Sequence, residues 1–402
     1  MNYLVAGDSW FADAPGGAAR VAGDIAAVMR DRGHRVAALA MCQQAGSPEV
    51  EDLEGIRVVR YDKPQIASFR PDAAGRCIAA AAAAARRHLA DVRWDVVHFH
   101  TPYTGNGALA AFGAGPRYVL TVHSPVVLEQ RINWAGEGWK GWLKLALGLP
   151  LMRRLESRLV RAAQRIHTLS EFTRRQVERF HAAAHKTTVI PYWRRPELRR
   201  TLSQTEARKQ LGWPAGVPIV FTVRALVERN GLADALQALT PAIRERRCML
   251  YVGGRGALRP RLERMAAEAG INERTVFMGR ISDEHLALAY QAADLFLLPT
   301  RALECFGLII IEALSYGCPV IATDAGAIPE VLAPLGREFI VPAGDVAAMR
   351  ARVEDFLAGR LRAPPADRLV DYVAQRYDAD VVVPRMVELL EGRPAVERRA
   401  AG

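Results

Sequence analysis

The sequence predicts an α/β protein of two doubly wound domains, each built on a parallel sheet. Short apolar segments of strand length alternate with helical segments along the chain, the order that places helices on both faces of a parallel sheet. With 402 residues, the chain is longer than one ordinary hydrophobic core accommodates. A basic, proline-containing connector follows the first half. We therefore expect a first domain over 1–195, a second over 196–375, and a C-terminal segment over 376–402.

The first domain is expected to begin with a strand, a turn at Gly16-Gly17 and a helix that ends near Gly33. Seven consecutive alanines favour a helix over 77–89, and a long helical stretch is expected over about 127–163. Strands are expected at 3–7, 36–39, 96–99 and 118–122. Residues 167–170 close a further short strand, and residues 189–191 end the first half.

The second domain follows a short helix whose start, Ser203 with Glu206 three residues later, has the spacing of a capping box. Further helices are expected at 231–239, 257–269, 283–292 and after Gly307, and strands at 219–223, 249–252, 276–278, 295–298 and 319–322. The last helix, near 379–391, can pack back on either half, and we assign it to the N-terminal domain.

Composition points to a globular protein of a reducing compartment. Half of the residues are hydrophobic and 24% are charged. The five cysteines are scattered, so they indicate neither a zinc site nor a disulfide framework. The acid at Asp8 comes too early for a signal peptide, and no apolar run approaches the roughly 18 residues of a spanning helix. We expect a cytoplasmic protein.

The net charge of +11 is concentrated in residues 131–200, whose excess of Lys and Arg equals that of the whole chain. Such a segment suits an anionic partner: a phosphate-bearing substrate, a membrane surface or a nucleic acid. Trp139 and Trp142 share a helix face beside lysines, so segment 131–165 can contact the inner face of a membrane peripherally. The alternative is that these tryptophans pack on the first domain while the arginines are solvated. Because no nucleic-acid motif is present, we expect no nucleic-acid partner.

Two glutamates eight residues apart, Glu304 and Glu312, carry the most functional information. Glu304 follows an apolar strand in a loop, and Glu312 lies within the helix that begins after Gly307. Glu312 can accept both hydroxyls of a ribose, and Glu304 can accept sugar hydroxyls and favour positive charge at an anomeric carbon. The N–H groups at the start of this helix can face a diphosphate, and they belong to Phe306, Gly307 and Leu308.

The block 251–330 resembles retaining glycosyltransferases of family 4, also called glycosyl transferases group 1. The matching segments include Tyr251-Val252-Gly253-Gly254, Val276-Phe277-Met278-Gly279-Arg280, the two-glutamate segment, and Gly326-Ala327-Ile328-Pro329-Glu330. The first half resembles the family more loosely, at Gly16-Gly17, Val97-His98-Phe99-His100, Thr121-Val122-His123 and Leu169-Ser170-Glu171-Phe172. The resemblance implies the GT-B fold, two Rossmann-like domains that face an interdomain cleft.

The resemblance also implies roles for single residues. It makes Glu304 a catalytic residue and places His123 against the donor sugar, where we favour donor positioning over general base catalysis. It implies that the loop at Gly16 and Gly17 and the strand ends at Gly253, Arg280 and Ile281 belong to the donor site, the last two through backbone contacts with the base. We expect His100, Tyr103 and Asn106 to form a strand-end loop that supplies an acceptor wall, whereas His98 is better explained by packing.

The chain departs from the family at the usual diphosphate clamp. Ala225 occupies the place of the usual arginine, and Asn230 that of the usual lysine. Arg224 and Arg229 each lie one position earlier, and we expect these guanidinium groups to bind the diphosphate, with Asn230 as a further donor-site residue.

These features predict a metal-independent, retaining glycosyltransferase that moves a sugar from a nucleotide-diphosphate sugar to a hydroxyl of a saccharide, small-molecule or lipid-linked acceptor. No cofactor is expected beyond this co-substrate, and no metal-binding cluster is apparent. The alternative is a catalytically impaired GT-B protein that binds nucleotide sugars. Neither the base, the sugar nor the acceptor follows from the sequence.

Overall fold

The computed structural model describes residues 1–402 except 14–15, 45, 64–71, 136–137 and 393–402. The chain divides into two compact units, Met1–Pro191 with the segment from Val383 onward, and Tyr192–Val382. The boundaries expected from the sequence were 195/196 and 375/376. The second boundary in the structure falls inside the last helix, so that this helix contributes to both units.

The first unit is built on a sheet whose described strands have the order β3-β4-β2-β1-β5-β6-β7-β8. These strands are β1 (Asn2–Gly7), β2 (Arg35–Met41), β3 (Val50–Leu53), β4 (Ile56–Tyr61), β5 (Val96–Phe99), β6 (Arg117–Val122), β7 (Arg165–Thr168) and β8 (Thr187–Val189). Neighbouring strands pair in parallel except β3 and β4, which form an antiparallel hairpin at the edge. The expectation of purely parallel pairing is therefore wrong at this edge, where two strands were not predicted.

The first unit also contains helices α1 (Gly17–Asp31), α2 (Ala73–His88), α3 (Pro102–Phe112), α6 (Leu149–Ala162) and α7 (Glu171–His181). The described core includes Leu4 and Phe99 from the strands and Ala81 and Leu159 from helices α2 and α6. The sequence analysis expected Tyr103 and Asn106 in a loop, but in the structure both residues lie in helix α3. Two glycines of α3 explain its packing, because a Cβ at Gly107 would lie 2.4 Å from that of Ala81.

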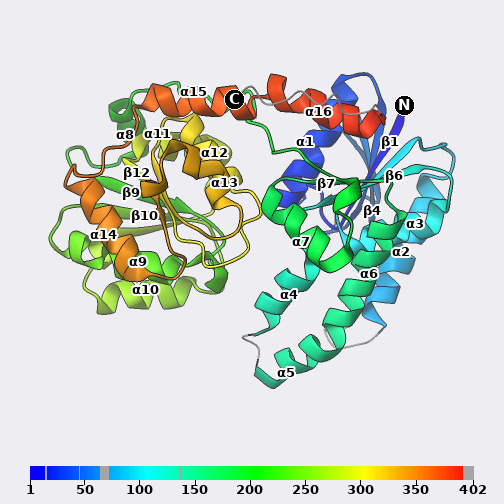
Figure 1. The fold of residues 1–402 in the computed structure, drawn as a ribbon, viewed down its shortest axis with the longest axis horizontal. Coiled ribbons are helices and arrows are strands. Elements are labelled where there is room, and N and C mark those ends of the chain that lie inside the picture. The colour runs from blue at the N-terminus through cyan, green and yellow to red at the C-terminus, as the bar shows by residue number, and fades with distance from the viewer. Residues whose placement is uncertain (14–15, 45, 64–71, 136–137, 393–402) are drawn as a thin grey trace. The chain divides into compact units, whose positions relative to one another are not determined.

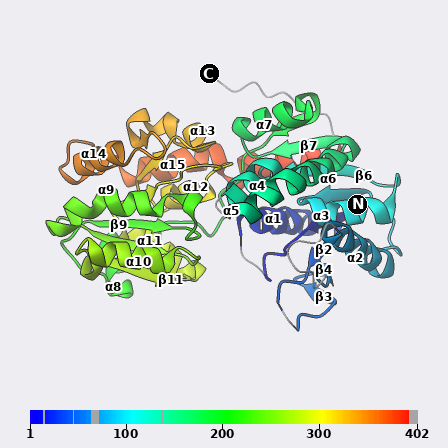
Figure 2. The same cartoon turned by 90° about the horizontal axis from the view of Figure 1, so that it is seen from below.

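Residues 126–162 form what we call the helical arm. Helix α4 (Val126–Ala135) and α6 run side by side, and α5 (Gly138–Leu143) lies at the end of the arm away from the sheet (Figures 1 and 2). A π-helical turn, Lys144–Gly148, connects α5 to α6. The single helix expected over 127–163 is thus divided. Trp134 packs on Gly148, where a Cβ would lie 2.8 Å from the indole ring.

The second unit has a sheet in which every described pairing is parallel, in the order β11-β10-β9-β12-β13-β14. Its strands are β9 (Ile219–Val223), β10 (Met249–Gly253), β11 (Thr275–Gly279), β12 (Leu295–Leu298), β13 (Val320–Thr323) and β14 (Ile340–Val341). One face carries α9 (Leu232–Arg244), α10 (Arg259–Glu268) and α14 (Val346–Leu357) (Figure 1). The other carries α8 (Gln204–Leu211), α11 (Asp283–Ala292), α12 (Leu308–Ser315) and α15 (Ala366–Tyr377). A short helix, α13 (Ile328–Leu332), follows β13.

Local sequence explains several element ends. The capping box predicted at Ser203 and Glu206 is present at the start of α8. The last helix, α16 (Ala379–Glu391), reaches the first unit, where the Arg117 guanidinium donates to the carbonyls of Leu389 and Leu390. A cation at the C-terminal end of a helix stabilises the carbonyl groups that have no partner within the helix. None of the described helices combines the length and the apolarity needed to cross a membrane.

Candidate functional site

In the second unit, the predicted donor residues gather where parallel strands reach their carboxyl ends. Arg224 directly follows β9, and its Nη2 donates to Glu304 Oε2 over 2.6 Å. Its Nη1 donates to Thr300 Oγ1, just beyond β12. Both charged side chains are largely buried, with exposed fractions of 8% for Arg224 and 16% for Glu304. The structure thus brings together the cation and the carboxylate that the sequence analysis placed in this site.

The backbone around Glu304 is held by close contacts on both sides. Leu303 has a φ of 58°, a conformation that side-chain-bearing residues rarely adopt. The Glu304 carbonyl accepts the N–H of Ala327 at 2.7 Å, and a Cβ on Gly326 would lie only 2.1 Å from the same oxygen. Strain of this kind persists only where neighbouring contacts determine the backbone, and it often accompanies functional sites.

The loop after Glu304 leads into the amino end of α12. Gly307 has a φ of 89° and precedes the first helical residue, Leu308, without a side-chain cap. The first N–H groups of an uncapped helix remain open to an anion, and the helix dipole favours one there. The Phe306 ring itself is buried and meets the Tyr377 ring edge-on, with centroids 5.9 Å apart. The side chain of Phe306 therefore anchors the loop and leaves only its backbone for a ligand.

Glu312 lies one turn further along α12 and is half-buried. Its Oε2 accepts the hydroxyl of Tyr290, on α11, at 3.2 Å. Tyr290 is buried, and this burial, together with the Glu312 charge, raises the pKa of its phenol well above the ordinary value. The phenol therefore remains a neutral donor that orients the carboxylate.

The residues of the unusual clamp segment have different surroundings. Asn230 is buried, and its Nδ2 donates to the Ala225 carbonyl at 2.7 Å, so its amide group holds the loop after β9 together. Arg229 is half-buried, and within the described part of the chain its guanidinium has no ion-pair partner. Of the two predicted clamp arginines, Arg224 is paired with Glu304, whereas Arg229 is available to an anionic ligand.

The ends of β10 and β11 are shaped by glycines. A Cβ on Gly253 would lie 2.4 Å from the Ile281 side chain, and one on Gly254 would overlap the Arg224 carbonyl at 1.8 Å. Arg280 is exposed after Gly279, and Ile281 is half-buried. Glycine is therefore required where these strand ends approach the loop that carries Arg224.

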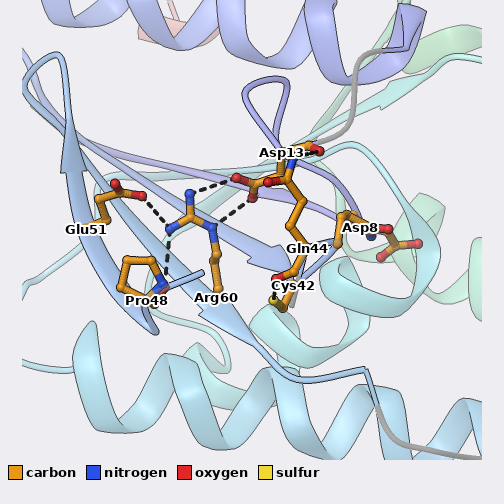
Figure 3. Close-up of polar contacts among 8 residues, drawn as sticks. Asp8, Asp13, Cys42, Gln44, Pro48, Glu51 and Arg60 are labelled. Carbon is orange, nitrogen blue, oxygen red and sulfur yellow. Dashed lines mark hydrogen bonds and ion pairs between the residues drawn. The ribbon is translucent and has the colours of Figure 1, made fainter. Parts of the chain in front are cut away.

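In the first unit, the loop after β1 is clamped by Arg60, which the sequence analysis did not identify. Arg60 is 3% exposed, and its guanidinium binds both carboxylate oxygens of Asp13, at 2.8 and 2.9 Å, and Glu51 at 2.8 Å (Figure 3). Gln44 adds a bond to the Asp13 carbonyl at 2.8 Å. Strand β4 also carries Arg57, so the sequence alone did not single out Arg60. The loop leads to Gly16 and Gly17, both exposed, where Gly16 is the N-cap of α1 and provides no side-chain cap.

A second cluster of predicted residues lines a pocket of about 190 Å³ in the first unit. His123, at the end of β6, and His100, at the end of β5, bond to each other through Nε2 and Nδ1 at 2.9 Å. Tyr103 also lines the pocket, and burial raises its pKa to about 12. Asn106 does not line it: its Nδ2 donates to the Pro102 and Leu155 carbonyls and joins α3 to α6. The pocket also contains Asp8, which the sequence analysis did not assign to the acceptor site.

Behind this pocket, a buried chain of hydrogen bonds crosses the sheet from Tyr3 to Ile190. The Ile190 carbonyl can only accept, so His167 Nε2 donates to it, and His167 Nδ1 accepts from the Thr121 hydroxyl. Thr121 in turn accepts from His98 Nε2, and the Tyr3 hydroxyl donates to His98 Nδ1. One carbonyl therefore determines the direction of every bond. Both histidines are neutral in this arrangement, which agrees with the lowering of their pKa by burial. The expectation that His98 is a packing residue agrees with its place here.

The pocket histidines are neutral as well. Burial is the main cause that lowers the pKa of His123 to about 3, and burial and neighbouring histidines lower that of His100 well below its usual range. Both rings can donate and accept hydrogen bonds, but neither carries a positive charge near neutral pH. Across the described residues, no group of three or more His, Cys, Asp or Glu side chains has an arrangement that could hold a metal ion.

Comparison with known proteins identifies the family. The model "Glycosyl transferases group 1" matches residues 203–376, and the model "Glycosyl transferase 4-like domain" matches residues 16–193. The chain belongs to the group 1 glycosyltransferases. This glycosyltransferase is 28% identical to a phosphatidyl-myo-inositol mannosyltransferase of Mycobacterium leprae over 94% of each chain. It is 32% identical to a D-inositol 3-phosphate glycosyltransferase of Nocardia farcinica over 53% of each chain.

Solved structures show the same two-domain GT-B fold. Sucrose-phosphate synthase from Thermosynechococcus elongatus superimposes with a TM-score of 0.81 at 21% identity, covering 97% of this glycosyltransferase and 98% of the synthase. Anabaena HepE in complex with UDP-glucose gives a TM-score of 0.74 at 21% identity, over 98% and 100% of the two chains. At these identities the likeness establishes the fold of this glycosyltransferase.

Proposed function

We propose that this glycosyltransferase transfers a sugar from a nucleotide-diphosphate sugar to an acceptor hydroxyl, with retention of configuration and without a metal ion. The observation that carries the proposal is the Arg224–Glu304 pair at the carboxyl ends of β9 and β12, beside the uncapped start of α12. It brings a carboxylate, a cation and open backbone donors to one edge of the sheet, the edge where open α/β sheets bind ligands. HepE, whose structure contains UDP-glucose, has the same fold.

In this proposal the second unit holds the donor. The N–H groups at Gly307 and Leu308 and the Arg229 guanidinium bind the diphosphate, with the dipole of α12 behind them. Glu312 accepts ribose hydroxyls, and Tyr290 orients it. Arg224 holds Glu304 in place, so that its carboxylate faces the positive charge that develops at the anomeric carbon. The cations and the helix dipole supply the charge stabilisation that a metal ion supplies elsewhere.

The proposed chemistry is a displacement on one face of the sugar. The bond from the anomeric carbon to the phosphate oxygen breaks, and a bond to the acceptor oxygen forms on the same face. The departing phosphate takes the acceptor's proton, so no separate base is needed. This agrees with a neutral His123, which serves to position the donor sugar through hydrogen bonds. Among the described residues and the relatives named above, we find no feature that favours the alternative of an impaired nucleotide-sugar binder.

The donor is tested by thermal unfolding of the protein with UDP, GDP, ADP and their sugars, since a ligand that binds the folded state raises the melting temperature. We expect one nucleotide to raise it and its sugars to be transferred or slowly hydrolysed. Glu312→Gln should reduce this shift, whereas Glu273→Gln, at an exposed position of the second unit, should not. The proposal is contradicted if no nucleotide sugar binds, or if one binds and is neither transferred nor hydrolysed.

We further propose that the helical arm binds the surface of an anionic membrane, which makes a lipid-linked acceptor accessible. Its large apolar side chains are unusually exposed: 73% for Trp139, 69% for Trp142 and 67% for Leu147. Exposed arginines follow on α6, among them Arg153 and Arg154. Apolar aromatic residues beside cations are typical of helices that lie in a membrane interface. The relative from M. leprae is named phosphatidyl-myo-inositol mannosyltransferase. Such contact is compatible with a cytoplasmic protein.

A further inference from the structure

The pocket that contains His100 and His123 is lined by buried polar atoms without partners. Within the described structure, His100 Nε2 and Ser124 Oγ are buried and make no hydrogen bond, and both residues line this one pocket. His100 is only 6% exposed. Buried polar groups without a partner cost free energy, so their concentration in one cavity indicates a ligand or ordered water that supplies hydrogen bonds.

The charge of this pocket is negative or neutral. Its lining includes the carboxyl groups of Asp8, Glu129 and Glu156, and no Lys or Arg is among its described lining residues. Glu156 is already paired with His181 at 2.9 Å. Asp8 Oδ1 accepts the N–H and the hydroxyl of Thr104, at 3.0 and 2.6 Å, and burial raises the pKa of this carboxyl. In either protonation state Asp8 carries no positive charge.

The histidines do not supply a cation. Their pKa values are lowered by burial, so that both rings are neutral at physiological pH. A phosphate group here would lose its water and meet carboxylates in place of guanidinium or ammonium groups, which is unfavourable for both charges. Uncharged hydroxyl groups meet no such penalty, because each can donate to a carboxylate or an imidazole and accept from a Ser or Thr hydroxyl.

The remaining walls suit the apolar face of a ring. Val122 and Leu159 line the pocket from β6 and α6, and Met152 adds a thioether from the helical arm. Small-molecule sites combine such apolar walls with a few converging polar groups. The cavity volume of about 190 Å³ is enough for a single six-membered ring with its hydroxyls.

We propose that this pocket binds the acceptor as an uncharged polyhydroxylated ring, a sugar or cyclitol whose held ring carries no phosphate monoester. The proposal rests on the proposed function for the identity of the ligand as an acceptor. Asp8 and Ser124 are specificity-determining residues, because both can pair with hydroxyls and the Asp8 carboxylate repels an anion.

The first test measures binding without the donor, by saturation-transfer NMR of the protein with matched pairs of probes: myo-inositol and myo-inositol 3-phosphate, and mannose and mannose 6-phosphate. We expect signals from at least one neutral ring and a response at least tenfold weaker from its phosphate. Equal or stronger binding of the phosphates overturns the proposal. No signal from any neutral ring also overturns it and makes the pocket a water-filled cavity.

Variants locate the binding site. We expect Ser124→Ala and Asp8→Asn each to weaken binding of the neutral ring at least tenfold, whereas Asp91→Asn, at an exposed position of the same unit, should leave it unchanged. Melting temperatures of all variants show whether the fold is intact, and Ser124→Ala remains informative if Asp8→Asn unfolds. Unchanged binding in a folded Ser124→Ala variant overturns the assignment of this pocket.

A transfer assay with the same probes separates this inference from the proposed function. If sugar is transferred, but mainly to phosphorylated rings, the acceptor inference is wrong and the proposed function stands. If neutral rings bind while no donor is turned over, the proposed function fails and the pocket assignment stands.

Discussion

At the scale of single residues, the account depends on the pairing of Glu304 with Arg224. A carboxylate that stabilises a cation-like sugar must be held in place, and a guanidinium at 2.6 Å restricts Glu304 to one position. The same contact means that Arg224 is already paired with Glu304 before a ligand binds. Arg229, which has no ion-pair partner among the described residues, is then the cation that can respond to the diphosphate.

Glu304→Gln removes the charge and keeps the size of the side chain, so it isolates the electrostatic contribution. We expect kcat to fall by roughly 10²–10³, the usual cost of losing one preorganised charge contact, with little change in melting temperature. Steady-state kinetics with the donor found by the nucleotide screen measure this effect. The matched control is Glu273→Gln, for which we expect unchanged kcat. A Glu304→Gln variant with full activity would remove Glu304 from the mechanism.

The residues that the sequence did not reveal are those whose role depends on distant partners. Arg60 and Asp13 are far apart in sequence and meet only when β4 lies in the same sheet as β1. Asn230 was expected to be a donor-site residue because of its position in the motif. Its amide instead holds the Ala225 carbonyl, a contact that only the folded loop reveals. By contrast, the spacing of Glu304 and Glu312 could be interpreted from the sequence alone, because the loop and the helix that carry them are adjacent along the chain.

At the scale of elements, the helices and strands of the second unit were predicted more accurately than those of the first. The predicted bounds of β9, α11 and β12 coincide with those in the structure, since each strand is a short apolar run and α11 begins at a capping serine. Helix α3 was missed because Gly105 and Gly107 lower its helix propensity. Its neighbours override this preference, since α2 and α6 approach so closely that only glycine fits. Strand β3 was missed because it is short, polar and at an edge.

The helical arm gives a prediction at this scale. Replacing Trp139 and Trp142 together by serine should weaken co-sedimentation with vesicles that contain phosphatidylglycerol at least tenfold, because both indoles are exposed and leave the membrane interface. Val50→Ser, at an exposed apolar residue on the edge of the same unit's sheet, is the control and should bind as the unchanged protein does. Binding should also weaken on vesicles of phosphatidylcholine alone. Undiminished binding of the double variant would show that the arm is not the membrane contact.

At the scale of the whole molecule, four neutral histidines lie in or beside the first sheet: His98, His100, His123 and His167. Burial lowers all four pKa values, to about 3 for His123 and about 4 for His167. In the unfolded chain the same groups titrate near 6.5. The unfolded state therefore binds more protons than the folded state once the pH falls below about 6.5, and stability then decreases as the pH falls.

We accordingly expect the free energy of unfolding to be nearly constant between pH 8 and 7 and to fall by several kcal/mol between pH 7 and 5. The reason is that, for each histidine, every pH unit below the pKa of the unfolded chain costs about 1.4 kcal/mol until the folded-state pKa is reached. Urea unfolding of the intact protein at these pH values measures the change. Replacement of the exposed His185 by glutamine should not alter the slope. Stability that is independent of pH over this range would contradict the neutral, buried state of the cluster.

The central claim is that the whole chain transfers sugar with retention and without a metal ion. The most direct test is ¹H NMR of the product formed from the preferred nucleotide sugar and a neutral polyol in excess EDTA. The account predicts transfer under these conditions and a product with the same anomeric configuration as the donor. A product of inverted configuration, or transfer that stops in EDTA and returns with a divalent cation, would contradict it.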